Sequence, residues 1–358
     1  MKSIILGDLH FGVKGFSDEF FDNQLEFFEK QLFPYMKENN IDTIIQLGDW
    51  MENRKNIDIK FFNKIVNSFC NKIVENNFKF ITFLGNHDIY YNSRLDINLV
   101  KYFQNLYPEN ITVLDKITKM NFGNSVYCFM PWLIDQKVHL HQIEDVDVLF
   151  GHFEIKNFEM VKGHIDQNSE LTSAFFQKAQ RLKKVVSGHY HVQSSDGFVI
   201  FAGTPYQLNW GDYNTPRGFF VIDEYDLDFI PNKISSKFVK IKYDDTKDEK
   251  IEIKGLTEDS IFLDSLEPAI DDLKKHHIKV FINNAKDKKY ENELYHLHQA
   301  EIKFGLINNV EISNLIGTDF NDDDIENISV TELILKTIKD GAPELLTKAQ
   351  HLLQNIQN

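Results

Sequence analysis

The sequence predicts an α/β fold in which parallel strands form two packed sheets with helices on the outside. In the first third of the chain, short apolar stretches alternate with helix-length stretches whose apolar residues recur every three or four positions. Such alternation is typical of a parallel sheet covered by helices. After about residue 110, short strand-like stretches recur with fewer helices between them, and a second sheet would accommodate these strands.

The elements of this core follow one another in a simple order. Those expected in the first third are a strand at 3–6, a helix from about Asp18 to Asn39, a strand at 43–47, a helix near 58–76 and a strand at 79–84. In the first helix, Phe21, Leu25 and Phe28 recur at the spacing of one helical face. The strands expected later lie at 125–130, 146–150, 184–187 and 198–202.

A domain boundary is expected near residues 230–245, where Pro231-Asn232 and the charged stretch 244–248 interrupt the apolar pattern. We therefore assign residues 1–230 to the first domain and 231–320 to a small α+β capping domain. The expected elements of the second domain are a strand at 277–283 and a helix at 287–301.

A C-terminal pair of helices is expected within residues 325–358, after a solvated linker at 322–324. Amphipathic patterns cover about 330–339 and 343–356, with Gly341 after the first helix and Pro343 at the start of the second. The apolar faces of these helices would either pack into the protein's own core or bind a partner.

Composition limits the classes of function. The net charge of −15 argues against a chain that binds nucleic acid through its own basic surface, so a polyanionic substrate would need metal ions or a basic partner. The apolar runs are strand-sized, so no membrane-spanning segment or signal peptide is expected. Only Cys70 and Cys128 are present, which favours the reducing cytoplasm over a disulfide framework.

Five apolar runs end in glycine followed at once by a side chain that binds metals. The pairs are Gly7-Asp8, Gly48-Asp49, Gly85-Asn86, Gly151-His152 and Gly188-His189. Glycine allows the backbone to turn sharply where a strand ends. Any one of these pairs could be a simple turn, because Gly, Asn and Asp all favour turns. Five in succession predict one shared site at one end of the sheets.

This site has enough ligands for two metal ions. Two further histidines lie at alternate positions after the first and last pairs, as in Asp8-x-His10, where both side chains can point the same way. The predicted ligands are Asp8, His10, Asp49, Asn86, His152, His189 and His191. A carboxylate such as Asp49 has two oxygens and can bridge two ions. Nitrogen and oxygen ligands without thiolates favour Mn, Fe, Co or Zn.

His87 is the candidate for acid catalysis. It directly follows the predicted ligand Asn86 and would protonate a leaving oxygen or stabilise the transition state, with Asp88 as its orienting partner. Paired metal ions promote hydrolysis of phosphate esters. The other two pairs with the same spacing, His139-x-His141 and His296-x-His298, have no strand and glycine before them, and we give them no role.

The ordered motifs resemble those of the calcineurin-like metallophosphoesterase superfamily, over residues 1 to about 225. Within it, the chain is most similar to SbcD-type DNA double-strand-break repair nucleases, especially the phage recombination endonuclease subunits that partner an SMC-like ATPase. The supporting stretches are 8–12, 203–205 and 216–219. The resemblance implies a four-layer αββα sandwich and two Mn²⁺ ions. One ion would bind Asp8, His10, Asp49 and His191, and the other Asn86, His152, His189 and the shared Asp49.

The resemblance also implies DNA as substrate, cleavage by exonuclease or endonuclease action, a homodimer, and C-terminal helices that dock on the ATPase. One position departs from the pattern: cellular nucleases of this type carry a histidine, linked to exonuclease action, where this chain has Glu52. Two alternatives remain. One is another phosphoesterase, such as a phosphatase or a cyclic-nucleotide phosphodiesterase. The other is a non-catalytic scaffold of the same fold, although no predicted ligand is missing here.

Overall fold

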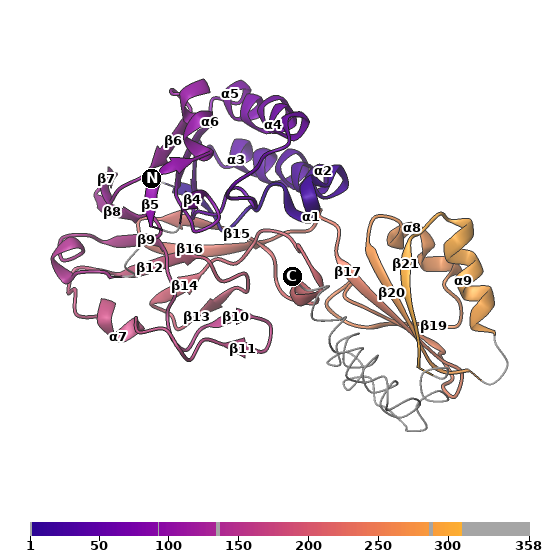
Figure 1. Ribbon diagram of the computed structural model, residues 1–358. Coiled ribbons are helices and arrows are strands. Elements are labelled where there is room, and N and C mark those ends of the chain that lie inside the picture. The colour runs from indigo at the N-terminus through magenta and orange to yellow at the C-terminus, as the bar shows by residue number, and fades with distance from the viewer. Residues whose placement is uncertain (1, 92, 134–136, 286–288, 310–358) are drawn as a thin grey trace, which may run out of the picture. The chain divides into compact units, whose positions relative to one another are not determined.

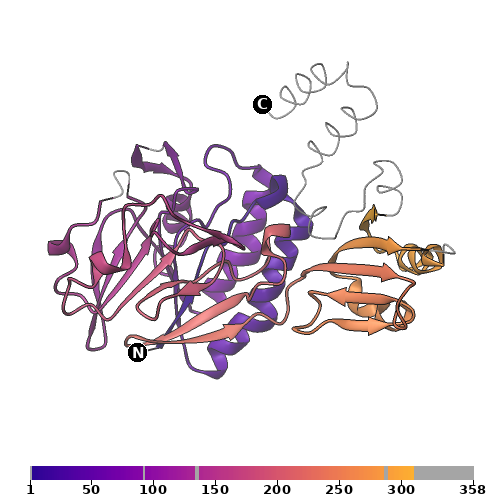
Figure 2. The ribbon, with the colours of Figure 1, turned by 90° about the horizontal axis from the view of Figure 1, so that it is seen from below.

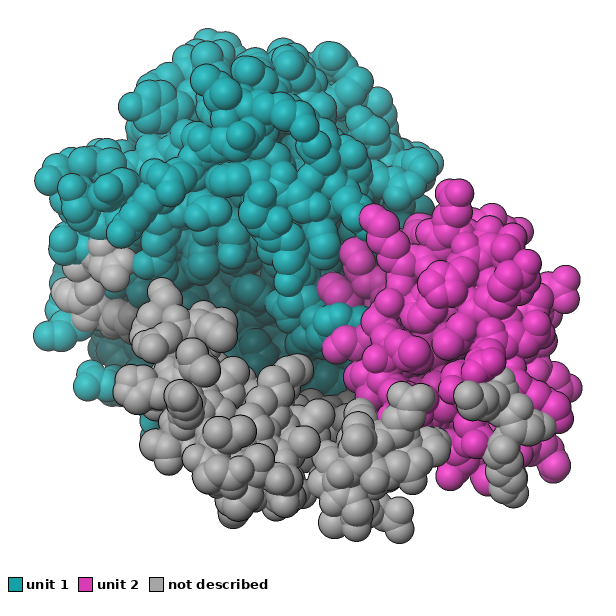
Figure 3. All heavy atoms as spheres, turned by 45° about the vertical axis from the view of Figure 1, so that its right-hand side comes forward, with its two compact units in different colours: residues 1–237 teal, residues 238–358 magenta. Residues whose placement is uncertain are grey.

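The computed structural model describes residues 2–91, 93–133, 137–285 and 289–309. The chain forms two compact units, the first ending at Lys237 and the second beginning at Phe238 (Figure 3). The predicted C-terminal helices at 325–358 lie outside the described residues. In the described part of the chain, no helix combines the length and the apolar character that crossing a bilayer requires.

The first sheet of unit 1 has six strands, four of them parallel. Its order is β16 (Asp226–Pro231), β15 (Gly218–Asp223), β1 (Lys2–Leu6), β2 (Thr43–Gln46), β3 (Lys79–Phe83) and β6 (Ile111–Leu114). Strands β1, β2, β3 and β6 are parallel, and β15 and β16 form an antiparallel hairpin against β1. The carboxyl ends of the four parallel strands therefore meet at one edge of the sheet.

The second sheet repeats this arrangement with a different set of strands. Its order is β13 (Ser194–Ser195), β14 (Val199–Phe201), β12 (Lys184–Gly188), β9 (Val148–His152), β8 (Ser125–Met130) and β7 (Thr118–Phe122). Strands β8, β9, β12 and β14 are parallel, and the two edge strands are antiparallel to their neighbours.

The two sheets pack face to face, because apolar side chains alternate along their strands. Ile5 and Ile45 of the first sheet share a buried cluster with Phe150 and Val186 of the second. The neighbouring residues Ile4 and Ile44 face the other way.

Helices cover the outer face of the first sheet (Figures 1 and 2). They are α1 (Val13–Phe16), α2 (Asp18–Phe27), α3 (Phe33–Glu38), α4 (Ile59–Ile65), α5 (Asn71–Glu75) and α6 (Val100–Leu106). π-helical turns, η1 (Phe28–Leu32) and η2 (Val66–Cys70), join α2 to α3 and α4 to α5. The two predicted helices near 18–39 and 58–76 are thus confirmed as continuous helical segments.

The α/β sandwich is confirmed, but its fourth layer contains little helix. The outer face of the second sheet packs on loop residues such as Phe153 and Phe158 and on the short helix α7 (Ser173–Phe176). The strands predicted in both sheets are present. The sequence pattern missed β6, β7 and the hairpin of β15 and β16. It also missed the short hairpins of β4 (Ile89–Tyr91) with β5 (Arg94–Asn98), and of β10 (Glu159–Val161) with β11 (His164–Ile165).

Unit 2 is a five-stranded mixed sheet with two helices in its described part. The sheet order is β19 (Ile261–Leu263), β18 (Ile251–Lys254), β17 (Phe238–Asp244), β20 (His277–Asn284) and β21 (Phe304–Asn308), and the helices are α8 (Ile270–Leu273) and α9 (Tyr290–Gln299). Val239, Val280 and Leu297 belong to its separate apolar core. The strand and helix predicted at 277–283 and 287–301 correspond to β20 and α9.

Candidate metal centre

The predicted site residues meet at the carboxyl edge of the two packed sheets. Asp8 and His10 follow β1, Asp49 follows β2, and Asn86 to Asp88 follow β3. In the second sheet His152 is the last residue of β9, and His189 and His191 follow β12. Ligand-binding groups collect at this edge in open α/β sheets because parallel strands end there together. All seven predicted ligands lie here.

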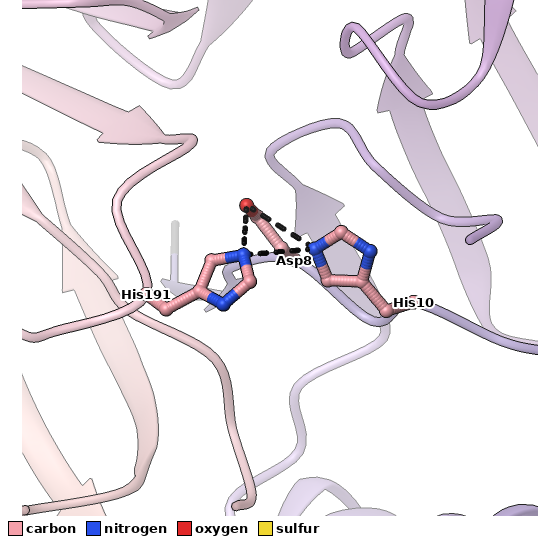
Figure 4. Close-up of side chains that lie close together, drawn as sticks. All are labelled: Asp8, His10 and His191. Atoms are coloured by element: carbon pink, nitrogen blue, oxygen red, sulfur yellow. Dashed lines mark hydrogen bonds and ion pairs between the residues drawn. The ribbon is translucent and has the colours of Figure 1, made fainter. Parts of the chain in front are cut away.

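One cluster is formed by Asp8, His10 and His191, shown in Figure 4. His10 Nε2 lies 3.0 Å from His191 Nε2, 3.9 Å from Asp8 Oδ2 and 3.9 Å from Asp49 Oδ2. His191 Nε2 is 4.0 Å from the same Asp8 oxygen. These atoms surround a volume that one metal ion could occupy.

A second cluster is formed by Asp49, His152 and His189, together with the Asn86 amide. Asn86 Oδ1 is 2.9 Å from His152 Nε2 and 3.0 Å from His189 Nδ1. His152 Nε2 also lies 3.3 Å from Asp49 Oδ2. Asp49 Oδ2 thus approaches histidines of both clusters, which is the position that a bridging carboxylate requires.

The glycines at the strand ends are required because side chains pass directly over them. A Cβ on Gly85 would lie 2.1 Å from Asp49 Oδ1, and a Cβ on Gly188 would lie 2.5 Å from Asp8 Oδ1. Both distances are far inside van der Waals contact. In these two motifs the glycine therefore makes room for a carboxylate from another strand end, Asp49 after β2 and Asp8 after β1.

Several residues of the site have a left-handed backbone. The φ angles of His10, Asp49 and His189 are 48°, 52° and 84°. Residues other than glycine adopt this region uncommonly, and such conformations collect at functional sites, where the surrounding structure maintains them. Here hydrogen bonds do so: His87 N donates to Asp49 Oδ1 at 2.7 Å, and His189 N donates to Asp8 Oδ2 at 3.0 Å.

His87 lies beside the first cluster, with its ring 5.0 Å from that of His10 between centroids. Its Nδ1 is 2.8 Å from the backbone carbonyl oxygen of Glu52, so Nδ1 must donate and Nε2 is the atom left for proton transfer. The expected orienting role of Asp88 needs correction. Both Asp88 oxygens accept backbone N–H groups, from Met51 at 3.0 Å and Gly85 at 2.9 Å, and so hold the loop itself.

Two acidic residues contact the histidines in a way that was not predicted. Glu52 Oε2 is 2.7 Å from His10 Nδ1, and Glu154 Oε1 is 3.3 Å from His189 Nε2. A carboxylate on the far nitrogen of a ligand histidine fixes its tautomer and orientation. The alternate spacing of His152 and Glu154 is the signal that could have identified Glu154. The sequence marks Glu52 only as a departure from the family pattern.

Arg217 fixes the loop that carries His191. Its buried guanidinium donates to the His191 carbonyl oxygen and to Thr204 Oγ1, and pairs with Asp212 Oδ1 at 2.8 Å. Trp132 lies beside the second cluster, with its ring 5.2 Å from that of His189. The sequence shows Thr204 and Arg217 in short motifs, but only the fold brings them behind His191.

Burial and neighbouring charges shift the pKa values across the site. Burial raises the pKa of Asp8 to about 7. Burial acts on Asp49 in the same direction, but His152 and His10 outweigh it, so the pKa of Asp49 lies below its usual value.

The histidines divide according to their acidic neighbours. Burial disfavours the charged form of His10, yet Glu52 and Asp49 raise its pKa to about 9. The pKa of His152 is also raised to about 9, because Asp49 and Asp8 outweigh burial. Burial and the nearby His10 lower the pKa of His191 well below the usual value.

The donor set fits a pair of divalent metal ions. Asp8 and Asp49 are almost fully buried, at 1% and 2% exposure, and two buried carboxylates need protons or cations to balance their charge. The opposed nitrogens of His10 and His191 need a shared proton or a cation between them. Imidazole, carboxylate and amide donors without thiolate suit first-row divalent ions.

Comparison with known proteins places this geometry in context. Residues 1–193 match the family described as calcineurin-like phosphoesterase. Exonuclease subunit 1 of Enterobacteria phage T4 is 34% identical over 242 residues, which make up 65% of this chain and 68% of that protein.

Two further relatives are more distant. Putative phosphoesterase 078R of Invertebrate iridescent virus 3 is 23% identical over 219 residues, 58% of each chain. The DNA double-strand break repair protein Mre11 of Nanoarchaeum equitans is 24% identical over 271 residues, 70% of this chain and 73% of that protein. The resemblance found in the sequence motifs is confirmed.

Proposed function

Because this chain belongs to the calcineurin-like phosphoesterase family, we propose that it is a two-metal DNA nuclease that hydrolyses phosphodiester bonds. The observation that carries the proposal is the position of Asp49 Oδ2, 3.9 Å from His10 Nε2 and 3.3 Å from His152 Nε2. One carboxylate oxygen between two histidine clusters supports a pair of adjacent ions. Two of the relatives carry nuclease or DNA-repair names, which supports DNA as the substrate.

In this proposal one ion is held by Asp8, His10 and His191, and the other by Asn86, His152 and His189, with Asp49 shared. When bound, paired divalent ions supply an activated water nucleophile and polarise the phosphoryl oxygens. Mn²⁺ is the proposed activator, because the family resemblance suggests it; the nitrogen and oxygen donors suit Mn, Fe, Co or Zn. Glu52 and Glu154 orient His10 and His189 through their second nitrogens.

His87 is the proposed general acid. Its side chain is one-third exposed, and its Nδ1 is engaged with the Glu52 carbonyl oxygen, so Nε2 is directed to exchange a proton with a leaving oxygen. Asp88 contributes indirectly: its two backbone hydrogen bonds hold the loop from Gly85 that carries Asn86 and His87.

We further propose that the chain works with partners: a basic ATPase subunit bound by residues 325–358, and a second copy of itself. The net charge of −15 supports a partner that attracts the DNA. Residues 231–320 would serve as a cap that guides DNA. Deletion of 325–358 should abolish co-purification with the ATPase and spare Mn²⁺-dependent hydrolysis of a small phosphodiester. Loss of both would show that the segment belongs to the core.

The test is cleavage of duplex and single-stranded DNA with Mn²⁺, using the wild type and Asp49→Ala. We expect cleavage by the wild type and none by the variant. Hydrolysis of p-nitrophenyl phosphate is measured in parallel with the same proteins. Rapid turnover of this monoester without DNA cleavage would overturn the nuclease proposal and favour a phosphatase.

A further inference from the structure

Two exposed tyrosines follow the candidate acid His87 along the chain. Asp88 and Ile89 are buried at 2% and 0% exposure, and Tyr90 and Tyr91 then emerge at 37% and 47%. Three residues of chain span at most about 10 Å, so the Tyr90 backbone lies within about 10 Å of the His87 backbone, roughly the length of three stacked nucleotides. A surface feature this close to the proposed acid would meet the nucleotides beside the scissile bond.

An irregularity in strand β4 brings the rings of Tyr90 and Tyr91 next to each other. Successive side chains of a regular strand point to opposite faces. Strand β4 pairs Ile89 with Asn98 and Tyr91 with Arg94, with a register shift between Ile89 and Tyr91. The Tyr90 and Tyr91 rings therefore lie 4.6 Å apart between centroids, at 69°. Bulges of this kind commonly redirect a side chain beside an active site.

A positive charge accompanies the rings. Lys55 is exposed, and its Nζ lies 5.9 Å from the Tyr90 ring centroid. Lys55 comes three residues after Glu52, whose carbonyl oxygen holds His87. Arg94 of the same hairpin is already paired with Asp96, at 2.6 Å from Nε to Oδ1. The patch thus joins two aromatic faces to one cation, although the chain as a whole is acidic.

Core packing does not account for this patch. In the described part of the chain, Ile89 belongs to the main buried cluster, whereas neither tyrosine does. Exposed aromatic rings beside a basic side chain are the elements of a surface for single-stranded nucleic acid, where bases stack on rings and cations contact the backbone.

We propose that Tyr90, Tyr91 and Lys55 form a stacking site for an unpaired base next to the scissile phosphate. The preferred substrate is then a single-stranded or frayed DNA segment rather than an intact duplex. This inference rests on the nuclease function proposed above. The two tyrosines act as positioning residues that lower KM, since stacking holds the base equally before and in the transition state.

The experiment compares two single-stranded oligonucleotides that differ only in having natural bases or abasic sites at the terminal positions. Mn²⁺-dependent cleavage is measured for the wild type, Tyr90→Leu and Tyr91→Leu. We expect the wild type to show a KM for the abasic strand roughly 5- to 150-fold higher, the range that stacking of one base supports. Each leucine variant should lower the ratio of the KM for the abasic strand to the KM for the natural strand, with little change in kcat.

The control is Tyr225→Leu. Tyr225 is 39% exposed and lies in the turn after β15. The nearby Asp223 pairs with Lys2, at the end of β1 opposite to Asp8, so this turn lies at the end of the sheet away from the metal centre. Tyr225→Leu should keep the wild-type ratio. Tyr90→Phe should also keep it, because phenylalanine still stacks.

Three results would overturn the inference in distinguishable ways. Cleavage by the wild type with equal KM for both strands would rule out the proposed stacking site and leave the proposed nuclease function standing. An unchanged ratio together with loss of a wild-type dimer in Tyr90→Leu, measured by sedimentation, would assign the patch to a second copy of the chain. Absence of cleavage of either strand by the wild type would remove the nuclease proposal itself.

Discussion

At the scale of single residues, acidic side chains behind the histidines define the site as much as the ligands do. Glu52 and Glu154 each lie against a nitrogen that faces away from the proposed metal position. Asp88 holds a loop, and Arg217 holds the backbone at His191. These contacts set the orientation of the imidazoles, and metal affinity depends on that orientation.

Glu52→Gln should weaken metal binding. The substitution removes the negative charge 2.7 Å from His10 Nδ1 and keeps the size of the side chain. Loss of a second partner of a ligand histidine typically lowers metal affinity by about 10- to 100-fold. Calorimetric titration with Mn²⁺ measures this change, and Glu144→Gln, an exposed site, is the control. Equal affinity in the two variants would contradict the role of Glu52.

Mn²⁺ affinity should rise between pH 7 and pH 9. In the metal-free chain, neighbouring acids raise the pKa values of His10 and His152 to about 9, so both imidazoles carry a proton at pH 7. A metal binds only the neutral imidazole, so the proton competes with it. Affinity should therefore increase with pH, by up to about tenfold per unit for each proton displaced. Calorimetry in buffers of different ionisation enthalpy counts these protons, and the absence of proton release at pH 7 would contradict the prediction.

His87→Ala should lower kcat without removing the metals. The His87 side chain is not among the seven predicted ligands, although it lies beside His10 and Glu52. General acid catalysis typically contributes about 10²- to 10⁴-fold. A loss of that size in Mn²⁺-dependent DNA cleavage, with unchanged Mn²⁺ affinity, is the expected result. If affinity falls along with kcat, His87 is a ligand and not an acid.

At the scale of elements, the site depends on close approach between strand ends. Gly85 and Gly188 allow the carboxylates that follow β2 and β1 to pass over the ends of β3 and β12. The π-helical turns keep the covering helices continuous. Because β1, β2, β3, β9 and β12 all end at one edge, small displacements of one strand end would move ligands of both clusters.

Gly188→Ala should damage both metal binding and stability. Its Cβ would lie 2.5 Å from both Asp8 Oδ1 and the Leu47 carbonyl oxygen, so the backbone must shift. Overpacking of this kind typically costs about 1–3 kcal/mol. Thermal unfolding with and without Mn²⁺ should show a lower Tm and a smaller increase on adding metal. Gly305→Ala is the matched control, since its nearest neighbour, Lys279 Cγ, would be 3.6 Å away; equal effects of the two variants would argue against the close-approach explanation.

At the scale of the whole molecule, the predicted metal ligands lie in one unit, whereas the excess of acidic residues is a property of the entire chain. All predicted ligands lie in unit 1, which has its own apolar clusters, and unit 2 has another. The net charge of −15 belongs to the entire chain and disfavours DNA binding in the absence of metals or a partner. Charge therefore predicts how DNA is delivered, and not whether the bond is cleaved.

Residues 1–237 should fold alone and keep the metal-dependent activity. The boundary at Lys237 falls between two units with separate cores, so truncation there leaves the apolar clusters of unit 1 complete. We expect hydrolysis of bis(p-nitrophenyl) phosphate with Mn²⁺ within about threefold of the full chain. A soluble, cooperatively folded fragment without this activity would show that unit 2 completes the site.

Much of the fold was predictable because apolar periodicity is a local property. The strands and the two long helices of the first third follow from the spacing of residues such as Phe21 and Leu25. The hairpins at 89–98 and 159–165 were not predicted, because short exposed strands lack a buried face. The thin fourth layer was also hidden, since loops and helices can supply the same buried phenylalanines.

The sequence by itself determined which residues meet: each ligand lies at or shortly after the end of a strand, and parallel strands end at a common edge. It did not determine what stands behind the ligands. The tertiary structure assigned Glu52 to His10, Glu154 to His189 and Asp88 to the loop, because those contacts depend on the distance between separate strand ends. Strand positions and side-chain alternation are encoded locally, whereas hydrogen-bond partners across a site depend on the packing of the whole unit.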